Sequence, residues 1–238
     1  KEVIQIERLH ICTWEFPNAD SYIEFGMEFS YRSFTNDTLN IWLSVPFIKE
    51  NDDVKCLLKN LADSANSRFI FNNIVSGISN IGADSRDGSV LHFEGRDSLT
   101  ILPCRIDVSS GLLKFTLNKP NRYEGNLYFR VLVKHNGTIA IKKSGIAQNT
   151  YIYDLKINET RNLPEDIYHL KSNENLQICQ IQNLFCLHSV PDDFEFSFIG
   201  SFTSNCDGSY GGRSYFRGYG MDDGFSLNTA DSMSIYIV

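Results

Sequence analysis

The sequence has no run of about 18 consecutive apolar residues, the length that predicts a membrane-spanning helix. It also has no run of more than two lysines or arginines, although it contains 22 of these residues. Proteins that bind nucleic acid or an anionic membrane surface through charge present a basic face or segment. With scattered basic residues and a net charge of −7, we expect neither nucleic acid nor a membrane surface as a partner.

The six cysteines contain no C-x-x-C pair, so the sequence predicts no structural zinc site. Four of them lie inside apolar runs, which is typical of buried free thiols: Cys12, Cys56, Cys104 and Cys186. We therefore expect a reduced, cytoplasmic protein. Secretion stays an alternative, because Asn-x-Ser/Thr sequons occur at Asn36, Asn136 and Asn158.

Motifs for phosphate binding, covalent hydrolysis and calcium binding are missing as well. The chain has no G-x-x-x-x-G-K-[ST] loop, no G-x-S-x-G elbow and no EF-hand loop. The histidines do not have the spacings that bring two imidazoles onto one metal ion. We therefore predict no cofactor and no metal ion.

Short runs of alternating apolar and polar residues dominate the chain. Residues 22–31 are one example, with Ile23, Phe25 and Met27 on one face and Glu24 on the other. Period-2 alternation predicts β-strands with one buried face. Similar runs, strongest at 126–134 and ending at 233–238, predict about 12 to 14 short strands.

One amphipathic helix is predicted at 52–65, where apolar residues follow a single helical face and Asp52 could cap the start. Strands do not alternate with helices, so a parallel βαβ fold is not expected. We predict an all-β protein, mainly an antiparallel β-sandwich, in one domain spanning 1–238. A subdivision near the polar segment 162–175 is the alternative.

The segment CDGSYGGRSYFRGYGMDDG, residues 206–224, combines glycines with aromatic and arginine side chains. Such side chains give a large contact area at low entropic cost in protein-binding loops. We predict a protein-binding surface at six of its residues: Tyr210, Arg213, Tyr215, Phe216, Arg217 and Tyr219. A glycine-kinked strand and turn that only closes the sheet is the alternative.

Three functions are compatible with these patterns. We favour a non-enzymatic β-sandwich binding module within a larger protein assembly, because no complete catalytic motif is present. The second hypothesis is a hydrolase whose Cys/His/Asp site assembles only in space, with candidates at Cys186, His188, Asp192 and Asp193. The third is a secreted carbohydrate-binding β-sandwich, which could use the aromatic and aspartate side chains of 207–223.

Overall fold

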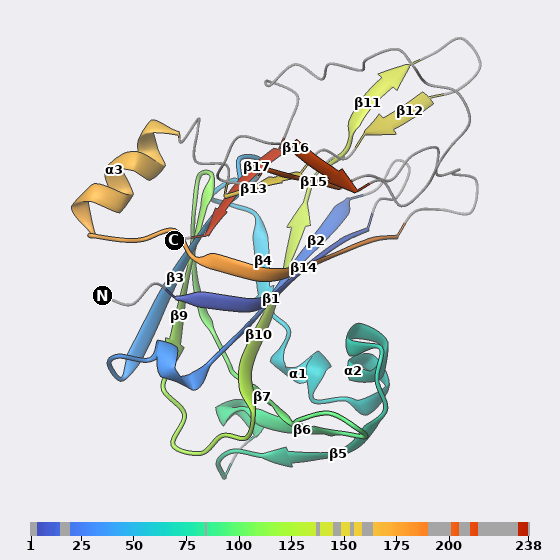
Figure 1. Ribbon diagram of the computed structural model, residues 1–238, viewed down its shortest axis with the longest axis vertical. Coiled ribbons are helices and arrows are strands. Elements are labelled where there is room, and N and C mark those ends of the chain that lie inside the picture. Colours follow the sequence, from blue (N-terminus) through green and yellow to red (C-terminus); the bar gives the residue numbers. More distant parts are fainter. Residues whose placement is uncertain are drawn as a thin grey trace.

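Strands make up most of the protein. The computed structural model describes residues 4–14, 20–83, 85–136, 139–144, 149–152, 155–158, 164–189, 201–204, 210–213 and 233–237. Among these residues the α-helices are few and short, and the strands form sheets with both parallel and antiparallel pairs (Figure 1). The prediction of an all-β protein is therefore confirmed.

The larger sheet has eight strands. Seven of them follow one another in the order β14 (Gln180–Ser189), β1 (Gln5–Trp14), β2 (Ser21–Phe29), β10 (Asn126–His135), β7 (Leu99–Ile101), β6 (Ser89–Phe93) and β5 (Val75–Asn80). Strand β1 is antiparallel to β2 but parallel to β14. A strand from the last third of the chain thus pairs with the first strand.

Strand β10 is the branch point of this sheet. One edge of β10 pairs with β2 along its whole length. The other edge is divided, because β7 pairs with its first residues and β4 (Asp53–Cys56) pairs with 131–134. The apolar alternation that predicted a strand at 126–134 therefore marks the centre of the sheet.

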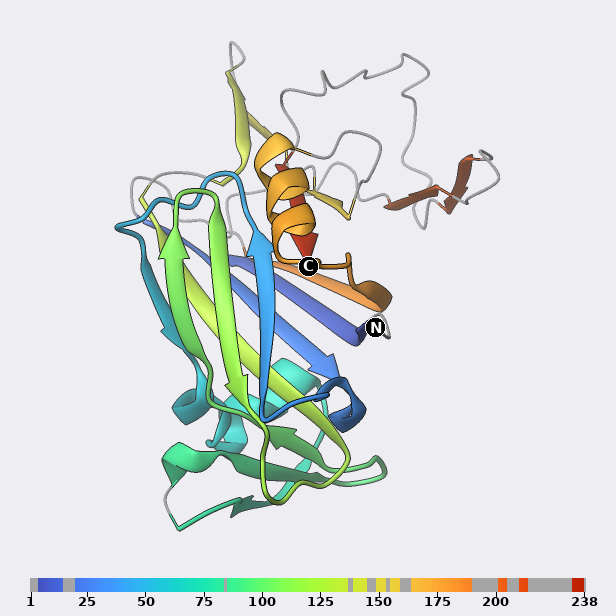
Figure 2. The same cartoon turned by 90° about the vertical axis from the view of Figure 1, so that its left-hand side faces the viewer.

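A second sheet packs on one face of the larger one (Figure 2). Its strands, in spatial order, are β13 (Leu155–Ile157), β17 (Met233–Ile237), β3 (Thr38–Ser44), β9 (Leu112–Asn118) and β8 (Arg105–Ser109). The two sheets share one apolar core, in which the rings of Phe115 and Phe129 are 5.2 Å apart. Gly111, with φ of 72°, makes the tight turn between β8 and β9.

The helix predicted at 52–65 is wrong in its first half. Residues 53–56 form strand β4, and the chain becomes helical only at α1 (Leu58–Leu61). Val54 and Cys56 fit a strand as well as a helix, since both lie on one side of a period-2 run. Pairing with β10 supplies the backbone hydrogen bonds that decide between the two.

The second helix, α2 (Ser64–Phe71), includes the mostly apolar run 68–71, whose composition also fits a strand. Asp63 caps it, because its carboxylate accepts a hydrogen bond from the backbone N–H of Asn66 at 3.0 Å. Phe71 is buried whereas Phe69 is 72% exposed. The run is thus amphipathic with helical rather than strand periodicity.

The third helix, α3 (Glu165–Asn173), lies in the polar segment 162–175. Its buried Ile167 packs against Trp42 and Leu112 of the second sheet. Two further ribbons have two strands each: β11 (Ile141–Ser144) with β12 (Asn149–Ile152), and β15 (Ser201–Ser204) with β16 (Tyr210–Arg213). The remaining helical turns are η1 (Tyr31–Ser33) and η2 (Ser85–Asp87).

Candidate functional site

The face of the larger sheet that points away from the second sheet is called the outer face here, and it carries a buried polar network. Side chains alternate across each strand. In β2, Glu24 therefore points to the outer face between core residues, and in β10 Tyr128 and Arg130 do the same. Leu61 and Phe71 of the two helices pack over this face beside Tyr128.

Arg130 is the centre of the network, with only 2% of its surface exposed. Its Nε donates a hydrogen bond to Glu24 Oε2 at 2.5 Å, Nη1 donates to Tyr128 Oη at 3.1 Å, and Nη2 donates to Cys12 Sγ at 2.9 Å. Burial disfavours the charge, but Tyr128 and Glu24 more than offset it and raise the pKa of Arg130. The guanidinium is therefore a fixed positive charge with defined partners.

The ring of Tyr128 lies directly against Gly26 of β2. A Cβ atom at Gly26 would be 1.9 Å from Tyr128 Oη and 2.7 Å from Cζ. No side chain larger than hydrogen fits there without displacing the ring. Gly26 is therefore required for the position of Tyr128 and, through it, for the network.

His10 of β1 connects the network to the surface. Arg130 can only donate, so Tyr128 Oη accepts from Arg130 and its own proton is available for His10 Nδ1, 2.9 Å away. Burial raises the pKa of Tyr128 to about 12, so the hydroxyl keeps this proton. Burial, then the charges of Arg130, Arg8 and Arg96, lower the pKa of His10 to about 4. The ring is thus neutral near pH 7, with its proton on Nε2.

A cavity of about 1120 Å³ lies beside His10 on the outer face. Its walls are β1, the end of α2 with the turn that follows it, Arg96 of the β6–β7 loop, and residues 184–187 of β14. We call this cavity the basic groove. Three arginines line it, Arg8, Arg68 and Arg96, and the described part of the lining contains no aspartate or glutamate.

The three arginines differ in how firmly they are held. Arg96 stacks on the ring of Phe93, with 4.4 Å between its Cζ and the ring centroid. Arg8 lies 3.5 Å from the carboxylate of Glu28. Arg68 is exposed on α2. Burial, then the charge of Arg8, lower the pKa of Arg96, and the carboxylates of Glu28 and Asp97 oppose this shift in part.

The same groove gathers exposed apolar side chains. Seven large hydrophobic residues are exposed in the described part of the chain, and four of them line the groove on the outer face: Phe69, Ile74, Phe185 and Leu187. Each is 46–72% exposed. Such a concentration is typical of a binding surface, because soluble proteins scatter exposed apolar side chains singly.

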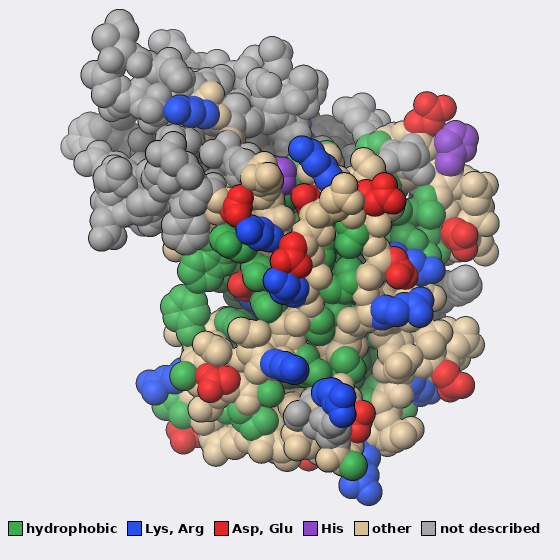
Figure 3. Space-filling model, turned by 180° about the vertical axis from the view of Figure 1, so that it is seen from behind, with side chains coloured by type: hydrophobic (Ala, Val, Ile, Leu, Met, Phe, Trp, Pro, Cys, Tyr) green, Lys and Arg blue, Asp and Glu red, His purple; other side chains and the backbone are tan. Residues whose placement is uncertain are grey.

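The view from behind shows a different surface (Figure 3). There, lysine, arginine, aspartate and glutamate side chains are interspersed, as on an ordinary solvated surface. The chain as a whole carries a net charge of −7. A groove whose described lining has three arginines and no carboxylate therefore differs from the overall charge of the chain.

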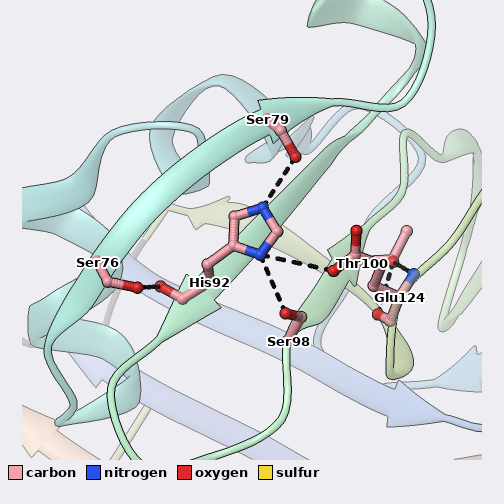
Figure 4. Close-up of polar contacts among 6 residues, drawn as sticks. All are labelled: Ser76, Ser79, His92, Ser98, Thr100 and Glu124. Carbon is pink, nitrogen blue, oxygen red and sulfur yellow. Dashed lines mark hydrogen bonds and ion pairs between the residues drawn. The ribbon is translucent and has the colours of Figure 1, made fainter.

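His92 is the centre of a second polar cluster, at the β5 edge of the larger sheet (Figure 4). Its Nε2 lies 3.0 Å from Ser79 Oγ, its Nδ1 lies 3.1 Å from Ser98 Oγ, and Glu124 Oε2 is 3.6 Å from Nδ1. Thr100 and the backbone of Glu124 exchange two hydrogen bonds. The cluster thus ties β5, β6 and β7 to the loop before β10.

A hydroxyl, an imidazole and a carboxylate in sequence are also the components of a serine hydrolase site. Ser79 has the nucleophile-to-base distance that this chemistry requires. The carboxylate of Glu124 is too far from His92 for the third member of a triad, because 3.6 Å is longer than a hydrogen bond. Ser98 Oγ lies closer to Nδ1. The geometry fits a cross-strand clamp better than a catalytic triad.

The protein-binding residues proposed from sequence are described only in part. Tyr210 and Arg213 are the ends of β16, which pairs with β15. Tyr215, Phe216, Arg217 and Tyr219 lie outside the described residues. The binding role of all six stays a prediction.

The hydrolase candidates lie partly on β14. Cys186 and His188 share one strand face, as the sequence indicated. Although the Cys186 residue as a whole is partly open to solvent, burial of its thiol raises the pKa to about 11. That thiol is protonated at neutral pH and is a poor nucleophile. His188 Nδ1 lies 2.5 Å from Thr13 Oγ1. Asp192 and Asp193 lie outside the described residues.

Sequence reasoning missed His10, Arg8, Arg96 and Arg130. The sequence did contain one signal for the network. Arg130 is a charged residue inside the most apolar strand, and Glu24 is a charged residue in a second apolar strand. Because charged side chains on buried strands need partners, an ion pair between these two residues could have been predicted. The groove itself had no signal, because its lining comes from four separated segments.

Within the described ranges no group of three or more His, Cys, Asp or Glu side chains could hold a metal ion. No helix among those residues is long and apolar enough to cross a membrane. Comparison with protein-family models, with curated proteins and with solved structures finds no match to this chain.

Proposed function

We propose that this protein is a binding module that holds an acidic, partly apolar segment of a protein partner in the basic groove. One observation carries the proposal: four exposed apolar side chains lie around three arginines, and no carboxylate is among the described residues of the lining. Arginines beside apolar and aromatic side chains are the composition of protein interface centres. The module would act within a larger protein assembly.

Charge complementarity selects the partner. A long polyanion such as nucleic acid would extend past the groove onto a protein with a net charge of −7. A short acidic segment matches the arginines and stays within the groove. Its apolar side chains would cover Phe69 and Leu187, which are 72% and 51% exposed.

The test is a peptide-display selection against the intact protein, followed by titration of the selected peptides. We expect the wild-type protein to select sequences that combine Asp or Glu with apolar residues. The double variant Arg68→Glu/Phe69→Ala changes two exposed residues of the groove and should weaken binding by at least about tenfold, or ~1.4 kcal/mol.

The matched control is Arg105→Glu/Tyr168→Ala, which makes the same kinds of change at exposed positions outside the groove lining. This variant should bind like wild type. Selected peptides without acidic residues, or equal weakening by both double variants, would contradict the proposal. Tight binding of single-stranded RNA or anionic vesicles in place of peptides would also contradict it.

A hydrolase is the second candidate, favoured by the 3.0 Å contact between Ser79 Oγ and His92 Nε2. A fluorophosphonate probe should modify Ser79 if this pair is activated, and His92→Ala should abolish the labelling. Absence of labelling on wild type, with a known serine hydrolase labelled in parallel, would eliminate this candidate.

We also propose that the protein is cytoplasmic. The alternative is a secreted, carbohydrate-binding protein. The five described cysteines are free thiols. Thiol counting under denaturing, non-reducing conditions on protein from its natural source separates the two. Six reactive thiols are expected for the cytoplasmic protein, and paired cysteines would support secretion.

A further inference from the structure

Strand β14 is the outermost strand of the larger sheet and borders the basic groove. It pairs in parallel with β1 along its full length, without a register shift. Among the described residues, no strand pairs with its other edge. Most of its ten residues are exposed. An exposed edge strand with apolar side chains is a template on which another strand can form hydrogen bonds.

The direction of the backbone groups in β14 follows from the hydrogen bonds across the sheet. The carbonyls of Tyr128 and Arg130 accept hydrogen bonds on the side of β10 away from β2, so the even-numbered residues of β2 face β1. His10 and Cys12 pair with such residues and therefore face β2, so their partners in β14, Phe185 and Leu187, face β1. The backbone groups of Leu184, Cys186 and His188 therefore point away from β1, toward the open edge.

The residues between these three, Phe185 and Leu187, contribute side chains to the groove. Phe185 is opposite His10 and Leu187 is opposite Cys12 in the register, so both side chains lie on the outer face. The rings of Phe185 and His10 are 5.2 Å apart in an edge-to-face arrangement. Leu184 is opposite Leu9, so its side chain lies on the other face, where it is 48% exposed. One strand thus offers hydrogen bonds and side-chain contacts together.

We propose that the partner binds as an extended segment that adds a strand to the open edge of β14. This inference rests on the binding function proposed above and names the form of the partner. Alternate side chains of such a strand would face the outer side, toward the arginines of the groove, and the others would face Leu184. The segment should therefore alternate acidic and apolar residues.

The experiment uses the selected peptides and two variants of the full chain. Leu184→Ala shortens the side chain but keeps the outward N–H, whereas Leu184→Pro removes both. Proline is tolerated on an edge strand where the N–H does not bond within the sheet, and circular dichroism of both variants checks folding. Leu184→Pro should bind at least about tenfold more weakly than Leu184→Ala.

A second measurement does not depend on the variants folding. Single N-methyl groups placed along a bound peptide should weaken binding at every other position, because only alternate N–H groups face β14. Uniform tolerance of N-methyl groups, with equal binding by both Leu184 variants, would overturn strand addition. A period of three to four in the apolar positions of the peptide would overturn it as well, since that pattern indicates a helix.

The two proposals fail in different ways. If Arg68→Glu/Phe69→Ala abolishes binding while N-methyl groups and Leu184→Pro do not, the groove binds its partner but not as a strand. If N-methyl groups and Leu184→Pro abolish binding while the groove variant does not, strand addition holds and the groove proposal falls.

Discussion

Replacing Gly26 with alanine tests the buried network with the smallest available change. The new methyl group would lie 1.9 Å from Tyr128 Oη, and Tyr128 is fully buried. The ring must move, which strains the core by about 1–3 kcal/mol. Its hydrogen bonds with Arg130 and His10 are disturbed at the same time, at about 1–3 kcal/mol for a bond to a charged group.

Alanine gains about 0.4–1 kcal/mol over glycine by restricting the unfolded chain. The expected net result is a loss of about 3 kcal/mol in the free energy of unfolding, measured by urea denaturation as a midpoint lowered by about 1 M or more. Gly77→Ala is the matched control, since a Cβ there meets His92 Cδ2 at an ordinary 3.7 Å. Equal stability of the two variants would refute the role assigned to Gly26.

Three further predictions concern the same protein. The pKa of His10 is lowered from 6.5 to about 4, so between these pH values the unfolded chain binds a proton that the native state does not. The free energy of unfolding should therefore fall by up to about 3 kcal/mol as the pH drops from 6.5 to 4. His10→Asn should remove that slope in urea titrations at several pH values, and an unchanged slope would contradict the assignment. Arg130→Met should destabilise the protein by about 3–5 kcal/mol, because it leaves the carboxylate of Glu24 without its partner. Arg130→Met/Glu24→Leu should recover part of this loss in thermal unfolding, and no recovery would count against the ion pair. A hydrogen bond with the Cys104 thiol lowers the pKa of Cys56 to about 6, so iodoacetamide at pH 7 should modify Cys56 fastest among the described cysteines, and Cys104→Ala should slow it. Mass spectrometry of the alkylated peptides measures both rates, and equal rates would contradict the thiol contact.

Strands with long alternating patterns could be predicted from sequence. Ile23, Phe25, Met27 and Phe29 form one buried row because a strand buries every second residue, and that row needs no knowledge of its partners. The helix at 52–65 could not be placed, because Val54 and Cys56 satisfy both periodicities over four residues. Only the distant strand β10 decides their structure.

The candidate site was less accessible to such reasoning than the fold. His10 looked like any strand histidine, and its neutral state depends on Arg130, 120 positions later in the chain by numbering. The parallel pairing of β14 with β1 has no local sequence signal, because the register of distant strands is fixed by tertiary packing. For the same reason, nothing in the local sequence distinguishes the exposed Phe185 and Leu187 from other strand residues.

The pairing of β1 with β14 also determines when the groove can exist during synthesis. Strands β1, β2 and β10 can assemble once residue 135 has emerged from the ribosome, but until β14 follows, β1 is an exposed edge. Among the described residues, β14 pairs with β1 only and β5, at the opposite edge, pairs with β6 only, so these two strands should detach and exchange their amide hydrogens before the central ones. A partner held by β14 would add its binding free energy to this last step of folding. The level of folded protein in a cell should therefore depend on the supply of its partner.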